Sequence, residues 1–355
     1  MVRRILSYVF IVFGLAALVL STSRNAMEYI SIKRDTTAWW GAYPCLNGDL
    51  VSLSYLDAVK RFNPPPNHVP LKKAEHSTSD NIVLYLHGDS YTYHLSDSIF
   101  TGTSAFHYID RNHGLKFTLD TSKRNVLVIE VSERYLRPYF STLRMLDEVG
   151  DTTKSTPAQA SIYGMPLSNH YASILPSFEV NDLFNKYINQ NLQCNLFNYN
   201  FIIPIFEYKA ALNYYVFNRA SGNVVISKDK NFLFLKETVS LTDAGSSYIP
   251  LNENDIQLLV NNFNVIYKHY RDQGFKEVYL SMIPNSASVV QPEGYNNLIP
   301  RIQSDTTLKM KIIDAHTLFK TEPTLYYQPG DTHWNSIGRQ KWIDLVNEYL
   351  KQQQL

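Results

Sequence analysis

The pattern of apolar and polar positions divides much of the chain into short apolar runs and longer amphipathic segments. Between residues 255 and 273 the apolar residues recur every three or four positions, which is a helical period, and Gly274 follows where a C-cap belongs. The same pattern predicts further elements: strands at 82–86, 126–129, 231–235, 278–283 and 311–314, and a closing helix at 336–352. Strands that alternate with helices predict an α/β fold with a mostly parallel sheet flanked by helices.

The N-terminal segment has a different pattern. Arg3 and Arg4 precede an apolar stretch at 5–20, which is close to the about 17–25 residues that a membrane-spanning helix needs. A cleaved signal peptide is the alternative, although no clear small-x-small cleavage site follows at 20–24. We therefore predict an N-terminal membrane anchor or signal segment at 1–24, with the arginines inside and the remainder of the chain exported.

The remaining chain divides into two parts by composition, and the second part contains an insertion. Residues 25–80 form an approach segment, in which the proline run at 64–66 excludes a helix. Residues 81–355 contain the predicted sheet and its helices. Within them, residues 141–215 are rich in Asn, Tyr and Ser and poorly periodic, which predicts an insertion with short helices that serves as a lid or substrate platform.

Composition narrows the class of protein. The 355 residues are 45% hydrophobic, which is ample for a packed core. The net charge of +1 and the lack of a long basic run argue against nucleic acid as a partner. Cys45 and Cys194 are the only cysteines; an exported protein can join them in a disulfide, but their spacing does not demonstrate one.

The first candidate for chemistry follows the first predicted strand. The apolar run at 82–86 leads into His87 and then into Gly88-Asp89-Ser90. Open α/β folds place their ligands at the carboxyl ends of sheet strands, so Ser90 is a candidate nucleophile. The alternative is an ordinary strand-ending turn, because Gly, Asp and Ser are common turn residues.

A base for this serine is found near the other end of the chain. His333 lies in the sequence Gly-Asp-Thr-His-Trp-Asn just before the last predicted helix, with Asn335 as a plausible N-cap. Asp331 and His333 are two residues apart, so in an extended segment both side chains point the same way. Asp331 would orient the imidazole while the other ring nitrogen faces Ser90, at about 2.6–3.2 Å from the hydroxyl. A polar turn followed by a helix cap is the alternative interpretation.

Together the two motifs resemble the SGNH (GDSL-type) hydrolase superfamily, in which the serine follows the first strand and the aspartate and histidine lie near the domain's end. The Asp-Thr-His-Trp motif, the segment 126–136 and the segment 283–289 are similar to the SGNH-type domains of bacterial polysaccharide O-acetyltransferases related to alginate acetylation. The resemblance covers roughly 80–140 and 220–355. The motif order, with serine first and Asp-x-His last, is that of ordinary SGNH enzymes and of the membrane-anchored D-alanyl transfer proteins of teichoic acid modification.

Two departures from the superfamily pattern affect the site. One residue separates Asp331 from His333, where two are usual, and no clear Gly-x-Asn block supplies the oxyanion hole. The resemblance then leaves the backbone N–H of Ser90 and the side chain of Asn285 as the oxyanion donors, although Asn285 can equally be a turn residue after the preceding proline. His87 and His94 flank the serine and compete as bases, but neither has a carboxylate at a helpful spacing.

The resemblance implies an SGNH-like, flavodoxin-like fold and an extracytoplasmic serine O-acyltransferase held at the cell membrane by one span, with its catalytic domain in the periplasm or at the cell surface. Ser90, His333 and Asp331 would form the catalytic triad, without a cofactor or metal. The acceptor would be a cell-envelope or secreted polysaccharide, and a membrane-bound O-acyltransferase would supply the acyl group. A carbohydrate esterase with the same triad and a non-catalytic polysaccharide-binding scaffold are the alternatives.

Overall fold

The computed structural model describes residues 2–23, 26–27, 30, 50–64, 69–74, 81–111, 114–151, 188–220 and 222–352. The chain separates into two compact units. Unit 1 comprises Met1–Pro64, Leu167–Leu233 and Pro329–Asp331. Unit 2 comprises Pro65–Pro166, Phe234–Gln328 and Thr332–Leu355.

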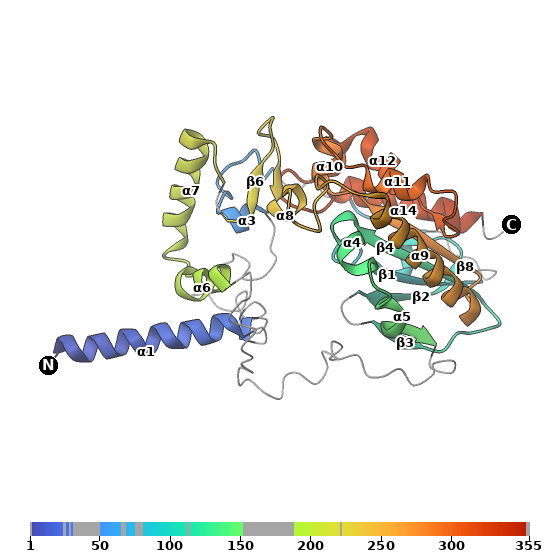
Figure 1. The fold of residues 1–355 in the computed structure, drawn as a ribbon, viewed down its shortest axis with the longest axis horizontal. Coiled ribbons are helices and arrows are strands. Elements are labelled where there is room, and N and C mark those ends of the chain that lie inside the picture. The colour runs from blue at the N-terminus through green and yellow to red at the C-terminus, as the bar shows by residue number, and fades with distance from the viewer. Residues whose placement is uncertain are drawn as a thin grey trace. The chain divides into compact units, whose positions relative to one another are not determined.

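Unit 2 is built on a five-stranded sheet in the order β2-β1-β4-β8-β9, and every neighbouring pair is parallel (Figure 1). Its strands are β1 (Ile82–Gly88), β2 (Thr103–Asp110), β4 (Arg124–Ser132), β8 (Glu277–Ile283) and β9 (Lys311–Ile312). A separate pair of parallel strands consists of β3 (Leu115–Phe117) and β5 (Val149–Asp151). The predicted α/β class with a parallel sheet flanked by helices is confirmed.

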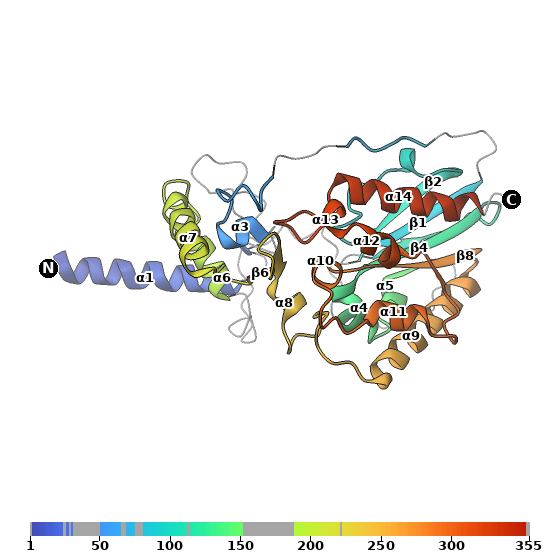
Figure 2. The ribbon, with the colours of Figure 1, turned by 90° about the horizontal axis from the view of Figure 1, so that it is seen from above.

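Helices cover both faces of this sheet, with α9 and α11 on one side and α14 and α12 on the other (Figure 2). The longer helices of unit 2 are α4 (Glu133–Phe140), α9 (Glu253–Gln273), α11 (Leu298–Gln303), α12 (Ala315–Thr321) and α14 (Ser336–Lys351). The shorter ones are η2 (Asp97–Ile99), α5 (Met145–Glu148), α8 (Lys236–Val239), α10 (Ser286–Val290) and α13 (Pro323–Tyr326).

The helix predicted from periodicity at 255–273 is α9. Asn252 and Asp255 form a capping box at its start, and Gly274 ends it with φ of 115°, a conformation that favours glycine. The apolar positions of α9 are buried against the face of the sheet that carries Val83, Tyr85, Leu127, Ile129 and Val131. Burial of this stripe, rather than helix propensity, is the main source of stability for such a helix.

All of the predicted strands correspond to observed ones, although one of them lies outside the main sheet and several observed strands are not predicted by the pattern. The segment 231–235 does form a strand, β7 (Leu233–Leu235), but β7 pairs with β6 (Val224–Ile226) in a two-stranded sheet and does not join the main sheet. The sequence pattern does not predict β2, because an edge strand has mixed burial and lacks a continuous apolar run.

Unit 1 consists mainly of helices, namely α1 (Val2–Thr22), α3 (Leu50–Ser54), α6 (Ile188–Phe197) and α7 (Ile203–Phe217). Helix α1 is long and apolar enough to cross a membrane, so the chain has one N-terminal apolar helix that is either a signal sequence or a single span. Cys194 on α6 is disulfide-bonded, and Cys45 lies outside the described residues. Residues 152–187 of the predicted insertion, and most of the predicted approach segment, also lie outside them.

Candidate active site

The turn after β1 depends on a glycine. A Cβ atom on Gly88 would lie 2.1 Å from Oγ1 of Thr92 and 2.9 Å from Oε2 of Glu130. Real Cβ atoms do not approach other atoms so closely, and both neighbours are buried. Glycine therefore allows the chain to turn directly over the Thr92 and Glu130 side chains.

Asp89 directs its side chain into the protein rather than toward solvent. Its carboxylate forms an ion pair with Arg111 (Nη1 to Oδ2, 3.0 Å) and accepts hydrogen bonds from the Ser132 hydroxyl (2.9 Å) and the Tyr91 N–H (2.9 Å). Burial acts to raise the pKa of Asp89, but the Arg111 charge and these hydrogen bonds outweigh it and hold the pKa below its ordinary value. Asp89 is thus a charged anchor for the turn.

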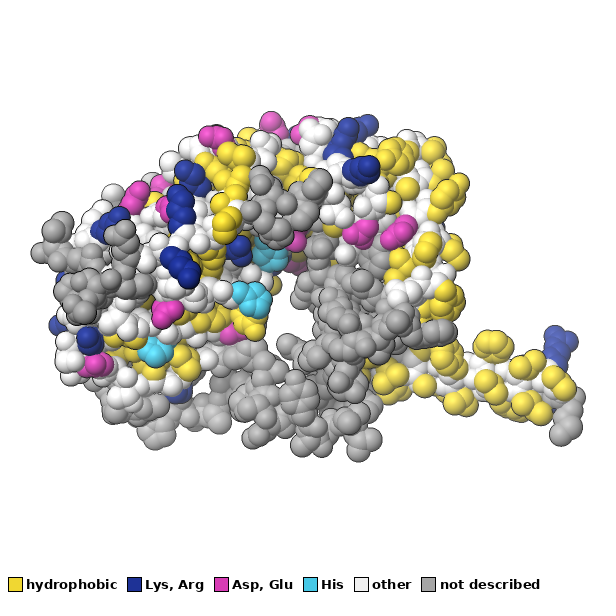
Figure 3. All heavy atoms as spheres, turned by 180° about the vertical axis from the view of Figure 1, so that it is seen from behind, with side chains coloured by type: hydrophobic (Ala, Val, Ile, Leu, Met, Phe, Trp, Pro, Cys, Tyr) yellow, Lys and Arg dark blue, Asp and Glu magenta, His cyan; other side chains and the backbone are white. Residues whose placement is uncertain are grey.

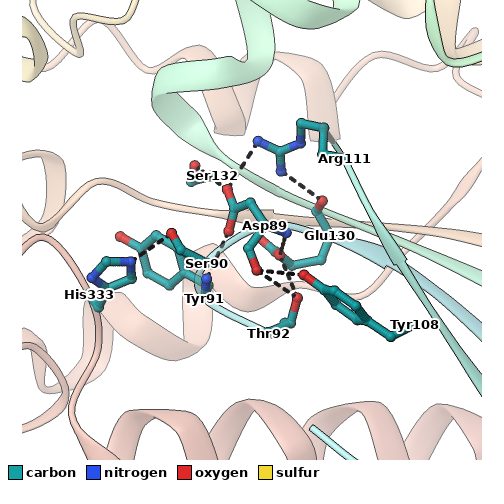
Figure 4. Close-up of polar contacts among 9 residues, drawn as sticks. All are labelled: Asp89, Ser90, Tyr91, Thr92, Tyr108, Arg111, Glu130, Ser132 and His333. Atoms are coloured by element: carbon teal, nitrogen blue, oxygen red, sulfur yellow. Dashed lines mark hydrogen bonds and ion pairs between the residues drawn. The ribbon is translucent and has the colours of Figure 1, made fainter. Parts of the chain in front are cut away.

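Glu130, near the end of β4, is the second buried carboxyl group beneath the turn. Its Oε2 accepts hydrogen bonds from the Asp89 N–H (3.0 Å) and the Thr92 hydroxyl (3.0 Å) (Figure 4). Complete burial, with the nearby negative charge of Asp89, raises the pKa of Glu130 to about 8, and the opposing effect of Arg111 is smaller. Glu130 is therefore mostly protonated at neutral pH.

Ser90 has the opposite orientation to Asp89: its side chain is exposed and faces His333 (Figure 4). The Oγ atom of Ser90 lies 2.8 Å from Nε2 of His333, across 243 residues of sequence. This distance lies within the range of about 2.6–3.2 Å predicted for the pair from the sequence. Because carboxyl ends of parallel strands meet at one edge of the sheet, the turn after β1 and the loop before α14 bring a hydroxyl and an imidazole together there.

The loop that carries His333 is held by Tyr91. The Tyr91 hydroxyl donates a hydrogen bond to the Thr332 carbonyl, and its ring lies 4.7 Å from the imidazole of His333 and 5.0 Å from the ring of Trp334, centroid to centroid. Trp334 is buried and stacks on Phe319 at 5.6 Å. The residue next to the serine thus fixes the segment that presents the histidine.

The backbone amide of Ser90 differs from its neighbours. The N–H groups of Asp89, Tyr91, Thr92 and Tyr93 all donate hydrogen bonds to Glu130 or to Asp89. For the N–H of Ser90, no acceptor occurs within the described part of the chain. An amide donor next to a nucleophile is the element from which an oxyanion hole is built.

The serine and histidine open into a pocket of about 400 Å³ lined by Asp89, Ser90, Tyr93, His94, Asp110 and His333. This volume is within the range of small-molecule sites. Neither Asn285 nor Asp331 is among these lining residues. Within the described ranges, no group of three or more His, Cys, Asp or Glu side chains is arranged to hold a metal ion.

The remaining predicted site residues have distinct environments. Asp331 is partly buried two residues before His333, and its role as the orienting carboxylate stays a prediction. Asn285 is buried; its Nδ2 donates to Ser247 (2.9 Å) and its N–H donates to Glu133 (2.9 Å). Asn285 therefore belongs to a buried network around Glu133, and its role as an oxyanion donor stays a prediction.

His87 and His94, the two alternatives to His333 as base, have different environments. His87 is fully buried in the sheet, and burial, aided by the positive charge of Arg111, lowers its pKa to about 3. It is therefore neutral and away from the pocket lining. His94 lines the pocket, but the hydroxyl of Ser90 is hydrogen-bonded to His333.

The supporting residues Arg111, Glu130 and Tyr91 were not predicted from the sequence. A signal existed for Glu130, since a carboxyl group that ends a buried strand has to be paired or protonated. Arg111 follows the unpredicted edge strand β2, so its place beside Asp89 could not be foreseen.

No protein-family model, no curated protein and no solved structure matches this chain. The chemistry of the site is therefore inferred from its own residues. The site contains an exposed serine hydroxyl that is hydrogen-bonded to an imidazole, and a backbone amide donor next to it. A buried charged network fixes the turn that carries the serine.

Proposed function

We propose that unit 2 is an SGNH-type serine acyl-transfer enzyme, and that the whole chain is a membrane-anchored, extracytoplasmic O-acyltransferase acting on a polysaccharide. The observation that carries the proposal is the 2.8 Å hydrogen bond between Oγ of Ser90 and Nε2 of His333 at the carboxyl edge of a parallel sheet. A serine hydroxyl is a weak nucleophile until a base removes its proton, and an imidazole at hydrogen-bond distance is such a base.

The proposed reaction has two half-steps. In the first, Oγ of Ser90 attacks the carbonyl carbon of an acyl ester while Nε2 of His333 takes the hydroxyl proton. The oxyanion accepts a hydrogen bond from the Ser90 N–H, and collapse expels the donor alcohol, which takes the proton back from His333. In the second, an acceptor hydroxyl attacks the carbonyl carbon of the acyl-serine and gives its proton to His333. The bond between the acyl group and Oγ of Ser90 then breaks, and His333 returns the proton to Oγ. Asp331 would hold the imidazole in the required tautomer.

The pocket lining favours a neutral polyol as acceptor. Tyr93 offers an exposed aromatic ring, and His94 and Asp110 offer groups that donate to or accept from sugar hydroxyls. Among the described residues that line the pocket, none is a Lys or Arg that would select a phosphate or carboxylate. An acetyl group as the transferred group, and a membrane-bound O-acyltransferase as its source, follow from the resemblance to polysaccharide acetylation proteins.

A carbohydrate esterase is the second candidate. Ser90 is exposed, so water reaches the acyl-enzyme as easily as a sugar does. The two functions share the first half-step and differ only in which hydroxyl completes the second.

Product analysis separates these functions. Full-length protein in lipid nanodiscs is incubated with an activated acetyl ester, with and without neutral oligosaccharides, and the products are identified by mass spectrometry. Acetylated oligosaccharide supports transfer, whereas free acetate alone supports the esterase. No turnover, together with retained oligosaccharide binding, would leave the polysaccharide-binding scaffold and reject both enzymes. A folded Ser90→Ala variant is the control for uncatalysed transfer.

A further inference from the structure

Helix α7 of unit 1 is apolar on two opposite faces. One face is buried and carries Ile203, Ala210 and Tyr214. The other carries residues spaced by three, four and three positions, which places them on one stripe of the helix: Ile205, Tyr208, Leu212 and Tyr215. These four side chains are between 48% and 76% exposed. A helix on a soluble domain normally presents polar residues on its outer face, so the exposed stripe indicates a partner.

The buried face fixes α7 within unit 1. The ring of Phe206 lies 5.2 Å from that of Tyr55, and the ring of Tyr214 lies 5.2 Å from that of Phe62. Phe206 also lies 5.7 Å from Phe197 on α6. The exposed stripe is therefore the outer surface of a packed helix.

The C-terminal end of α1 is attached to the same unit. The carbonyl of Ser21 accepts a hydrogen bond from Nδ2 of Asn191 (2.8 Å), and its hydroxyl accepts one from Nδ2 of Asn195 (2.7 Å). Both asparagines lie on α6, and Ser21 is completely buried. The apolar side chains of α1 that precede this contact are largely exposed. If α1 spans a membrane, α6 and α7 are held next to the surface where it emerges.

We propose that the exposed stripe of α7 is a second membrane contact, which lies in the lipid–water interface beside α1. Helix α7 runs across the direction of α1 in both ribbon views, which is the orientation of an interfacial helix next to a spanning one (Figures 1 and 2). Hydrophobic side chains follow both helices on the surface (Figure 3). Two of the four stripe residues are tyrosines, which are enriched at membrane interfaces.

The stripe contacts the apolar part of the lipid rather than anionic headgroups. The charged residues of α7, Glu207 and Lys209, lie off the stripe, and their charges cancel. Binding therefore depends on apolar burial and needs no anionic lipid. This inference goes beyond acyl transfer and does not depend on it.

The test places a fluorescent probe on the stripe of the full-length protein. Tyr208→Cys is labelled with an environment-sensitive nitrobenzoxadiazole and reconstituted into phosphatidylcholine vesicles, some of which carry nitroxide-labelled acyl chains. Tyr208 is 76% exposed, so the substitution should be tolerated. We expect a blue-shifted emission that the nitroxide lipid quenches, and no further change when anionic lipid is added. Leu212→Cys is a second position on the same stripe and should respond alike.

The matched control is Leu258→Cys on α9, a 46% exposed leucine of unit 2, which should keep a water-like, unquenched emission. Water-like emission at both Tyr208 and Leu212 would overturn the proposal. Energy transfer between labelled copies without quenching by lipid would also overturn it and assign the stripe to a second copy. Hydrolysis of a soluble ester by the labelled protein reports the proposed function separately, so each proposal can fail alone.

Discussion

Adjacent residues in the turn after β1 have opposite environments. The carboxylate of Asp89 is buried against Arg111, whereas the hydroxyl of Ser90 is exposed and faces His333. The buried Asp89 holds the turn through its ion pair with Arg111. Loss of either partner would leave an unpaired charge in a site of low dielectric constant, which strongly destabilises the folded state. Rigidity of this kind is what a nucleophile needs, because catalysis requires its geometry to be set before the substrate arrives.

The three proposed catalytic residues should not contribute equally. Ser90→Ala should reduce acyl transfer or ester hydrolysis by at least about a thousandfold, and His333→Ala by a similar factor, because they act as one unit. The loss of activity in Asp331→Ala should be smaller than in Ser90→Ala by about one to two orders of magnitude, because the imidazole still acts as a base when its orientation is only partly lost. The Ser90/His333 double variant should equal either single variant, as measured by kcat/KM on an activated ester.

Ser96→Ala provides the control for these variants. Ser96 is an exposed serine near the same turn, and its hydroxyl pairs with that of Ser98 (2.9 Å). It should retain full activity. Substantial activity in a folded Ser90→Ala variant would mean that the Gly-Asp-Ser sequence is only a turn.

Glu130 should make the stability of the protein depend on pH. Its pKa is about 8 in the folded state and about 4.5 when unperturbed, so between these values the folded protein holds a proton that the unfolded chain has released. The free energy of unfolding should therefore fall as pH rises through this window, by about 1.4 kcal/mol per pH unit from this group. Glu130→Gln resembles the protonated carboxyl group and should lack this dependence.

Denaturant unfolding of both proteins at pH 5, 6 and 7 measures the difference. The unfolding free energy of Glu130→Gln should rise relative to that of the native protein as pH rises. Parallel pH profiles would show that Glu130 is ionised in the folded state, and that Arg111 outweighs its burial.

At the scale of elements, the cap of α14 links stability to the site. The side chain of Asn335 accepts the N–H groups of Ile337 and Gly338, both at 3.0 Å, two residues after His333. Asn335→Ala should cost about 1 kcal/mol of stability. It should also lower kcat/KM by about ten- to hundredfold, because the loop that carries the imidazole loses its attachment to the helix.

A second capping asparagine separates the two effects. Asn252 caps α9 by accepting the Asp255 N–H at 2.8 Å, and it does not line the pocket. Asn252→Ala should lose a similar amount of stability in denaturant titrations and keep its kcat/KM. Equal kcat/KM values for Asn335→Ala and the native protein would show that the cap does not help to position His333.

The elements that could be predicted from sequence are those with a strong local pattern. The central strands β1, β4 and β8 are almost continuously buried and each contains an apolar run, and α9 has a clear period with a cap at each end. Helix α7 has no such signal, because it is apolar on both its buried and its exposed faces. Strand β2 was not predicted for a related reason. It is an edge strand with mixed burial, so its sequence has no continuous apolar run.

At the scale of the whole molecule, the residues of the site that could be predicted are those that lie in short sequence motifs. Ser90 follows a recognisable strand and His333 precedes a recognisable helix. The need of a serine nucleophile for a base, together with the order of elements in an α/β fold, predicted that the two side chains meet. The contacts of Asp89 with Arg111 and of Tyr91 with Thr332 join segments whose registers depend on tertiary packing. No local pattern encodes such contacts, and the structure was needed to find them.

At the same scale, the attachment of α1 to α6 bears on whether the N-terminal segment is retained in the mature protein. Ser21 is buried and hydrogen-bonded to two asparagines of α6, so removal of α1 would leave buried polar groups without partners. We therefore expect α1 to be retained as an anchor rather than cleaved as a signal sequence. Mass spectrometry of the protein from the membrane fraction should find peptides that include residues of α1.

A paired variant tests whether this attachment is structural. Asn191→Ala combined with Asn195→Ala removes both hydrogen bonds to Ser21 while leaving the apolar span intact, so the protein should stay in the membrane but unfold more readily by about 1–3 kcal/mol. Gln257→Ala on α9 removes an exposed hydrogen bond to Asp305 and should leave stability nearly unchanged. A mature N-terminus located after Ser21, in protein released from the membrane, would contradict the anchor and with it the membrane contact of α7.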